Sequence, residues 1–279
     1  MKKITKLLVN LLSFAMLLVA CLGLIGCSKD ESVDLEFTLA IYNTTDGEYY
    51  EDTTLTITLY KEYAPETVAA ILSYVNEGYY DDTFFYTTST NRIMVGDLKM
   101  NADGEIYQNQ VKPTLKPEFE RGAVTGSDLK YKEGTVGIWR TWFENNDYND
   151  NASLDTGRAT MFFPTATVSD YDGWFCLFAT LDITDTTNYT TLTYLKSVLE
   201  NGEEYNVFYT LEDGAEYDST NEQENNGLTF NCLKEIPENA EVFKPKGEQY
   251  DCYKQHTIKV AEGLGNTSGA RIVSAKVID

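Results

Sequence analysis

The chain has 279 residues, with 44 acidic side chains against 22 basic ones and a net charge of −22 at pH 7. This surplus of negative charge repels nucleic acid, which is itself anionic, and it disfavours broad docking on anionic lipid. Aromatic residues, mostly tyrosine, make up 13% of the chain, too many for an intrinsically disordered protein. We therefore expect a folded chain with one sizeable core and no nucleic-acid partner.

The N-terminal segment is typical of an export signal. Lys2, Lys3 and Lys6 form a positive start, and an uncharged apolar run covers residues 7–25. A charged start before an apolar run is the pattern of a secretion signal. The run is also long enough to be weighed as a membrane-spanning helix.

The end of this run favours the signal. Leu24-Ile25-Gly26-Cys27 resembles the lipobox of bacterial lipoproteins. The resemblance implies that residues 1–26 are removed, that the thiol of Cys27 is acylated, and that residues 27–34 form a tether. Attachment of more than one acyl chain gives stable anchoring. The alternative is an uncleaved anchor helix, and both interpretations place the protein outside the cytoplasm, on a membrane of the bacterial cell envelope.

The first half of the remaining chain predicts two strands and then a helix. Residues 35–39 and 55–59 carry apolar side chains at every second position, which is typical of strands, and residues 44–47 suit a turn between them. Pro65 suits a first helical turn and Gly78 a position just past a helix end. Between them the apolar spacing becomes that of one helix face, at Val68, Ile71, Leu72 and Val75.

The second half repeats this mixture. A second helix is predicted over residues 192–199, and residues 203–256 are acidic, rich in Asn and weakly patterned, which indicates an insertion. Further strands are predicted at 83–88, 93–95, 135–139, 159–163 and 174–181, and residues 257–260 and 271–278 should close the chain as a hairpin. The fold class is therefore mainly β with two helices, formed by residues 35–202 plus 257–279 around the insertion.

The number and spacing of the cysteines, together with the single histidine, His256, exclude several kinds of catalytic and metal site. No Ser-His or Cys-His nucleophile motif and no zinc-ligand spacing is present, so no metal and no cofactor are expected. Cys176 lies in an apolar run and is predicted to be a buried thiol. Cys232 and Cys252 either form a disulfide, which an oxidising compartment would permit, or stay free.

Residues 144–151 place oxygen ligands at alternate positions, as a calcium loop does. Ala152 stands where the EF-hand glycine would be, and Arg158 stands where its glutamate would be. These two changes favour a solvated loop.

Several short motifs occur in a meaningful order. They are Leu55–Tyr60, Ala64-Pro65-Glu66-Thr67-Val68, Gly78-Tyr79-Tyr80-Asp81-Asp82-Thr83-Phe84-Phe85, Met94-Val95-Gly96-Asp97, Gly134–Ile138, and Asp172-Gly173 before Phe178. Over roughly residues 50–200, with the closing strand at 271–278, this order resembles the cyclophilin-type peptidyl-prolyl cis-trans isomerases.

The resemblance implies an eight-stranded β-barrel capped by two helices, and an isomerase that assists the folding of exported chains. Rotation about an X-Pro bond is slow because of its partial double-bond character, with a barrier of ~18–20 kcal/mol. In the family, an arginine donates to the proline nitrogen as that nitrogen becomes pyramidal, while an apolar pocket holds the ring. Such a donor stabilises the twisted state selectively.

This sequence departs from the family at most of those positions. Phe85-Tyr86-Thr87 stands for the family's F-H-R, so Thr87 replaces the catalytic arginine. Asp170 falls on the rim tryptophan, and Arg92, in place of an apolar groove residue, is a candidate substitute donor. At the other groove positions of the family, Ile93 stands in place of a methionine, Val95 and Thr160 in place of two glutamines, Tyr171 in place of a leucine and Phe175 in place of a histidine. Phe162 keeps the pocket phenylalanine.

Two functions are consistent with these observations. The first is a surface-anchored isomerase acting on exported polypeptides, with activity weakened or lost because Thr87 carries no charge and has a short reach. The second is a non-catalytic module that binds a peptide or an envelope protein. An open pocket beside Phe162 with Arg92 pointing into it would favour catalysis, whereas filling by Phe175 or Tyr171 would exclude it.

Overall fold

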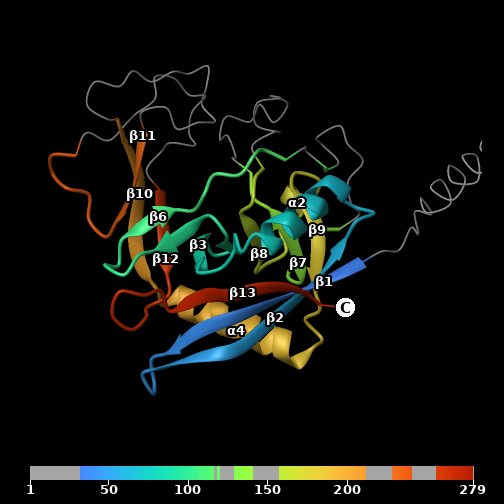
Figure 1. The fold of residues 1–279 in the computed structure, drawn as a ribbon, viewed down its shortest axis with the longest axis horizontal. Coiled ribbons are helices and arrows are strands. Elements are labelled where there is room, and N and C mark those ends of the chain that lie inside the picture. The colour runs from blue at the N-terminus through green and yellow to red at the C-terminus, as the bar shows by residue number, and fades with distance from the viewer. Residues whose placement is uncertain are drawn as a thin grey trace, which may run out of the picture. The chain divides into compact units, whose positions relative to one another are not determined.

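The computed structural model describes residues 32–115, 118–119, 129–140, 157–211, 228–240 and 256–278 (Figure 1). The signal, Cys27, Cys252 and the candidate calcium loop at 144–151 lie outside these ranges. The helices are α2 (Pro65–Asn76), α4 (Thr186–Glu200) and a short 3-10 turn, η2 (Ser169–Tyr171). Neither α-helix in this part of the chain is long and apolar enough to span a bilayer.

Strands make up most of the fold. The first seven are β1 (Ser32–Asn43), β2 (Glu48–Tyr60), β3 (Tyr86–Ser89), β4 (Arg92–Val95), β5 (Leu98–Met100), β6 (Ile106–Gln108) and β7 (Thr135–Ile138). The others are β8 (Met161–Pro164), β9 (Cys176–Leu181), β10 (Glu203–Leu211), β11 (Leu228–Leu233), β12 (His256–Val260) and β13 (Ala270–Ile278). The mainly-β class with two helices is confirmed.

Eleven of the strands form one sheet, in the order β11-β10-β12-β3-β4-β8-β7-β9-β2-β1-β13, and β5 pairs only with β6. The sheet is not the closed eight-stranded barrel that the resemblance implies. The two ends of the run from β3 to β13 do meet, however, because Phe84 and Arg271 form an antiparallel bridge beside β3. The strands β10, β12 and β11 extend the sheet beyond β3, at the end of Figure 1 away from β7 and β9.

The long β1–β2 hairpin follows from the alternation in the sequence. Leu35 opposes Ile57 and Phe37 opposes Leu55 in its register, and all four side chains are fully buried. Burying every second side chain puts the whole apolar set on one face, which fixes the register of the pair. These strands form one wall of the main core.

Helix α2 begins where the sequence predicts, with Pro65 in its first turn. The buried Glu118 carboxylate accepts hydrogen bonds from the amides of Glu66 (3.1 Å) and Thr67 (2.8 Å). It thus satisfies two amides that have no partner within the helix, and places negative charge at the positive end of the helix dipole. Gly78, just past the helix, has a φ of 68°, which glycine adopts without strain.

Helix α4 starts earlier than predicted. Asp185 caps it by accepting from the Asn188 amide (2.9 Å), so the helix begins at Thr186 rather than Leu192. The first turns carry Thr, Asn and Tyr instead of an apolar stripe, which hides them from a periodicity search. Asn188 also attaches the helix to β2, because its side chain bonds both the amide (2.9 Å) and the carbonyl (3.2 Å) of Thr56.

One expectation about the second half was wrong. Residues 257–260 and 271–278 do not form a hairpin, because β12 pairs with β10 and β3, whereas β13 pairs with β1. The range 203–256, predicted to be a weakly patterned insertion, contains the two strands β10 and β11. Both strands mix polar and apolar residues, which explains why their pattern was weak. The short strands β5 and β6 were also not predicted.

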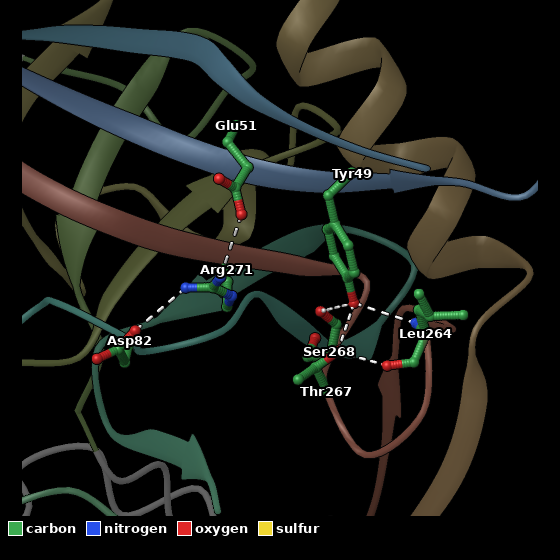
Figure 2. Close-up of polar contacts among 7 residues, drawn as sticks. All are labelled: Tyr49, Glu51, Asp82, Leu264, Thr267, Ser268 and Arg271. Carbon is green, nitrogen blue, oxygen red and sulfur yellow. Dashed lines mark hydrogen bonds and ion pairs between the residues drawn. The ribbon is translucent and has the colours of Figure 1, made fainter. Parts of the chain in front are cut away.

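The seam between β13 and the chain before β3 is held by polar contacts (Figure 2). Arg271 lies between Asp82 (3.1 Å) and Glu51 (3.7 Å). Beside it, the Tyr49 hydroxyl contacts Thr267 Oγ1 (2.6 Å) and accepts from the Leu264 amide (3.1 Å), so the β1–β2 hairpin holds the loop that leads into β13 (Figure 2).

Candidate functional site

The strands that carry the predicted groove residues have two different faces. Ile93 and Val95 of β4 pack into the main core, together with Phe85. Met94 lies directly opposite Phe162 of β8, and both belong to a second buried cluster. Because side chains alternate along a strand, Arg92 shares the face of Met94. The sequence alignment thus placed Ile93 on the wrong face, and Met94 is the residue that adjoins Phe162.

Five aromatic side chains gather over this second face. We call them the aromatic cluster: Tyr131, Trp139, Phe162, Tyr171 and Phe175. The Phe162 ring centroid lies 5.0 Å from that of Phe175 and 5.6 Å from that of Tyr131. Trp139 stacks on Phe175 at 5.3 Å, and Tyr171 meets Tyr131 edge-on at 5.0 Å. Offset and edge-on rings at these separations attract one another beyond their burial of area.

The cluster fills the space beside Phe162. Phe162 is fully buried and Phe175 is 3% exposed, whereas Trp139 and Tyr171 are half-buried at the surface. Tyr131 is fixed by its backbone, because its amide donates to the Asp172 carboxylate (2.8 Å) and its carbonyl accepts from the Val168 amide (3.2 Å). A ring from outside cannot contact Phe162 unless these side chains move.

Arg92 lies against this cluster. Its guanidinium carbon is 4.2 Å from the centre of the Trp139 ring, a cation–π distance. Its Nε is buried and has no hydrogen-bond partner. Burial raises the pKa of Tyr131 to about 12, and the nearby Arg92 guanidinium acts in the opposite direction.

The Thr87 side chain is bonded within its own hairpin. Its hydroxyl lies 2.7 Å from the Arg92 carbonyl and close to the Ser89 carbonyl, and it accepts from the Ser89 amide at 3.2 Å. These bonds hold the side chain within the β3–β4 turn. Thr87 therefore stabilises the hairpin backbone.

A second polar group that the sequence did not single out lies beneath this face. The buried Tyr86 hydroxyl donates to the Asp97 carboxylate, with oxygen distances of 3.0 and 2.9 Å. Burial raises the pKa of Asp97 to about 6, although bonds from Tyr86, its own backbone amide and Thr160 lower it. Thr160, which aligns with a family glutamine, is buried, and its side chain forms a hydrogen bond with Asp97.

The cysteines behave as structural residues. Cys176 is a buried thiol, as predicted, within 3.4 Å of the Thr67 hydroxyl, and burial raises its pKa to about 12. Cys232 is also buried. Because Cys252 lies outside the described residues, the pairing of Cys232 with Cys252 stays a prediction. The part of the chain that the structure describes contains no cluster of three or more His, Cys, Asp or Glu suited to a metal.

Comparison with known proteins identifies the family. A family model described as cyclophilin type peptidyl-prolyl cis-trans isomerase/CLD matches residues 43–206. The chain belongs to the cyclophilin family. The motif order in the sequence therefore led to the right family. No curated protein matches the sequence significantly.

Two similar solved structures are of a cyclophilin type peptidyl-prolyl cis-trans isomerase from Cryptosporidium parvum. One, crystallised in the presence of the dipeptide Ala-Pro, is 16% identical with a TM-score of 0.39, covering 59% of this chain and 85% of that chain. The other is 12% identical with a TM-score of 0.40, covering 77% of this chain and 99% of that chain.

Within this cyclophilin, the predicted groove residues fall into two sets. Phe162, Tyr171 and Phe175 come together in the aromatic cluster, with Arg92 beside them. Phe85, Ile93 and Val95 are core residues on the other face. Sequence reasoning missed Met94, Tyr131 and the Tyr86–Asp97 pair. Side chains alternate between the two faces along β4. This alternation was the signal that could have shown that Met94, and not Ile93, lies on the face of Phe162.

Proposed function

We propose that this protein is a lipid-anchored cyclophilin of the bacterial cell envelope that binds polypeptides without catalysing proline isomerisation. The observation that carries the proposal is the burial of Phe162 beneath Phe175, Tyr131 and Trp139. A proline ring needs that space. Moving the covering rings would expose buried aromatic surface, at ~1.5–3 kcal/mol for each side chain.

The missing donor supports the same conclusion. With Thr87 bonded to its own hairpin, no charged group stands at the position of the family's arginine. The loss of one preorganised donor raises a reaction barrier by ~3–4 kcal/mol, which is a factor of several hundred in rate. A filled pocket and an absent donor together leave a fold that can hold a polypeptide on its surface but lacks the means to twist its X-Pro bond.

A second candidate function is residual catalysis, and the position of Arg92 is the observation that favours it. Its buried Nε has no partner and its guanidinium lies beside the aromatic cluster. The experiment is cis/trans exchange in an Ala-Pro peptide, followed by NMR with the complete chain in detergent. No acceleration supports the loss of catalysis. Acceleration that Arg92→Ala abolishes and Lys276→Ala leaves intact would instead identify a relocated donor.

The membrane anchor has its own test. Expressed in a bacterium, the wild-type chain should incorporate labelled palmitate and remain with the membrane fraction. Cys27→Ser should remove the label, whereas Cys21→Ser, a matched change within the signal, should retain it. Equal labelling of Cys27→Ser and wild type would refute lipidation at Cys27.

We also propose that β3, β4, β8, β7, β9, β2, β1 and β13 correspond to the eight barrel strands of the family. The bridge between Phe84 and Arg271, which links the two ends of this run, supports the assignment. In this interpretation β10, β11 and β12 are an addition beside β3. They come mainly from the range 203–256, for which the compact family core has no counterpart.

A further inference from the structure

In the described ranges, the Arg92 guanidinium forms no ion pair with a carboxylate. Several other basic side chains there do: Lys112 lies 2.6 Å from Glu77 and Lys196 lies 2.6 Å from Glu133. With twice as many acidic as basic residues in the sequence, an unpaired arginine is unexpected. Its surroundings are aromatic, and they leave its positive charge without a counter-ion.

The Arg92 guanidinium also lies against an aromatic ring. It lies 4.2 Å over the half-buried Trp139 ring, and its Nε is buried without an acceptor. A buried donor that has lost its water and gained no acceptor is unfavourable, so an incoming oxygen would find a group already stripped of solvent. Arg92 itself is only partly buried and remains accessible from outside.

We propose that Arg92 and Trp139 form a binding site for the C-terminal carboxylate of a polypeptide. This inference rests on the proposed function, since it names what the non-catalytic module binds. A planar guanidinium matches a carboxylate with two parallel hydrogen bonds, more closely than it matches a single carbonyl oxygen. The partly exposed Trp139 ring would contact the last side chain of the bound chain.

The charge of the protein narrows the class of ligand. A net charge of −22 opposes phosphorylated or strongly acidic partners, because each further negative charge is repelled by the whole surface. A chain end brings a single carboxylate on an otherwise neutral or basic segment. At a chain end, the carboxylate and the last side chain are attached to the same α-carbon, so both can reach Arg92 and the adjacent rings together.

The test compares two forms of one peptide, acetyl-Ala-Lys-Ala-Phe with a free carboxylate and the same peptide ending in an amide. Binding to the complete chain in detergent is measured by calorimetry, and the NMR signal of the Arg92 Nε–H is followed in parallel. We expect the acid to bind at least tenfold more tightly than the amide and to shift the Nε–H signal. Equal binding of the two forms, or an unchanged Nε–H signal, would overturn the proposal.

Matched variants separate this site from general electrostatics. Arg92→Gln should remove the preference for the acid, whereas Lys276→Gln, which deletes the same charge at an exposed site on β13, should keep it. A third peptide, acetyl-Ala-Asp-Ala-Lys-amide, tests a side-chain carboxylate. If it binds as tightly as the free acid, recognition of the chain end is refuted. The acid–amide comparison uses the unaltered chain, so it holds even if Arg92→Gln fails to fold.

The outcome can be distinguished from a failure of the proposed function. The same samples are assayed for Ala-Pro exchange. Acceleration of exchange would refute the non-catalytic function whatever the peptides do. Absence of exchange together with absence of acid-specific binding would refute only the carboxylate site.

Discussion

The Tyr86–Asp97 pair predicts an unusual dependence of stability on pH. Asp97 is partly buried next to a tyrosine hydroxyl, and desolvation of its carboxyl raises its pKa from 3.8 in the unfolded chain to about 6. The folded state therefore holds this proton more tightly than the unfolded state does. A shift of about two pKa units, at ~1.4 kcal/mol for each unit, corresponds to about 3 kcal/mol.

The sign follows from linkage. Because the folded pKa is raised, the stabilising contribution of Asp97 is fully present below pH 4 and is lost as the pH rises through about 6. Asp97→Asn keeps an oxygen that can accept from the Tyr86 hydroxyl, but it cannot ionise. The variant should therefore resemble wild type near pH 4 and exceed it in free energy of unfolding by up to about 3 kcal/mol above pH 7.

The assay is urea unfolding of wild type and Asp97→Asn between pH 4 and pH 8. Only the difference between the two proteins is interpreted, because other groups titrate equally in both. Asp103→Asn, at an exposed position, serves as the matched control and should show a difference that does not change with pH. A pH-independent difference for Asp97→Asn would refute the assignment of a raised pKa to this carboxyl.

Three further substitutions test individual contacts. Phe175→Ala removes the ring that packs on Phe162 and should lower the free energy of unfolding by ~3–5 kcal/mol in urea titration, since it leaves a cavity in the aromatic cluster. Glu118→Gln should cost about 1 kcal/mol in the same assay, because the N-terminus of α2 loses a charged cap; no change would indicate that water replaces it. Tyr49→Phe deletes the hydroxyl that holds the loop before β13, so hydrogen exchange at the Leu264 amide should accelerate, and an unchanged rate would contradict that contact.

The parts of the fold that were predictable are those where one face of an element is apolar and the other is polar. The hairpin of β1 and β2 and the helix beginning at Pro65 were predicted because burial selects every second residue in one and every third or fourth in the other. The start of α4 was missed because its buried face there carries Asn188 and Thr191. These polar residues are satisfied by hydrogen bonds to β2, which no pattern of hydrophobicity reports.

The pairing of strands that are far apart in the sequence was harder to predict. β12 and β13 are both short apolar segments near the end of the chain, and proximity suggested a hairpin. The register shows instead that β12 pairs with β3 and β10, whereas β13 pairs with β1 and meets the chain just before β3. Which edge a short strand joins depends on the packing of distant segments, and local pattern carries no information about it.

At the site, the structure brings together only some of the residues that the family motifs assigned to one groove. The alignment assigned Ile93 to the groove, although it points into the main core, and passed over Met94. A shift of one residue in a strand moves a side chain to the other face, so motif matching alone does not decide this position. The pairing of Met94 with Phe162 does decide it.

The same alternation explains how a cyclophilin can keep its fold and change its groove. Along β4 and β8, Ile93, Val95, Met161 and Phe163 face the main core, which fixes the barrel-like arrangement. The intervening residues face the aromatic cluster and contribute little to that core. Substitution on the groove face therefore meets few constraints from the fold. Added rings such as Phe175 can even increase burial, so stability gives no pressure to keep the pocket open.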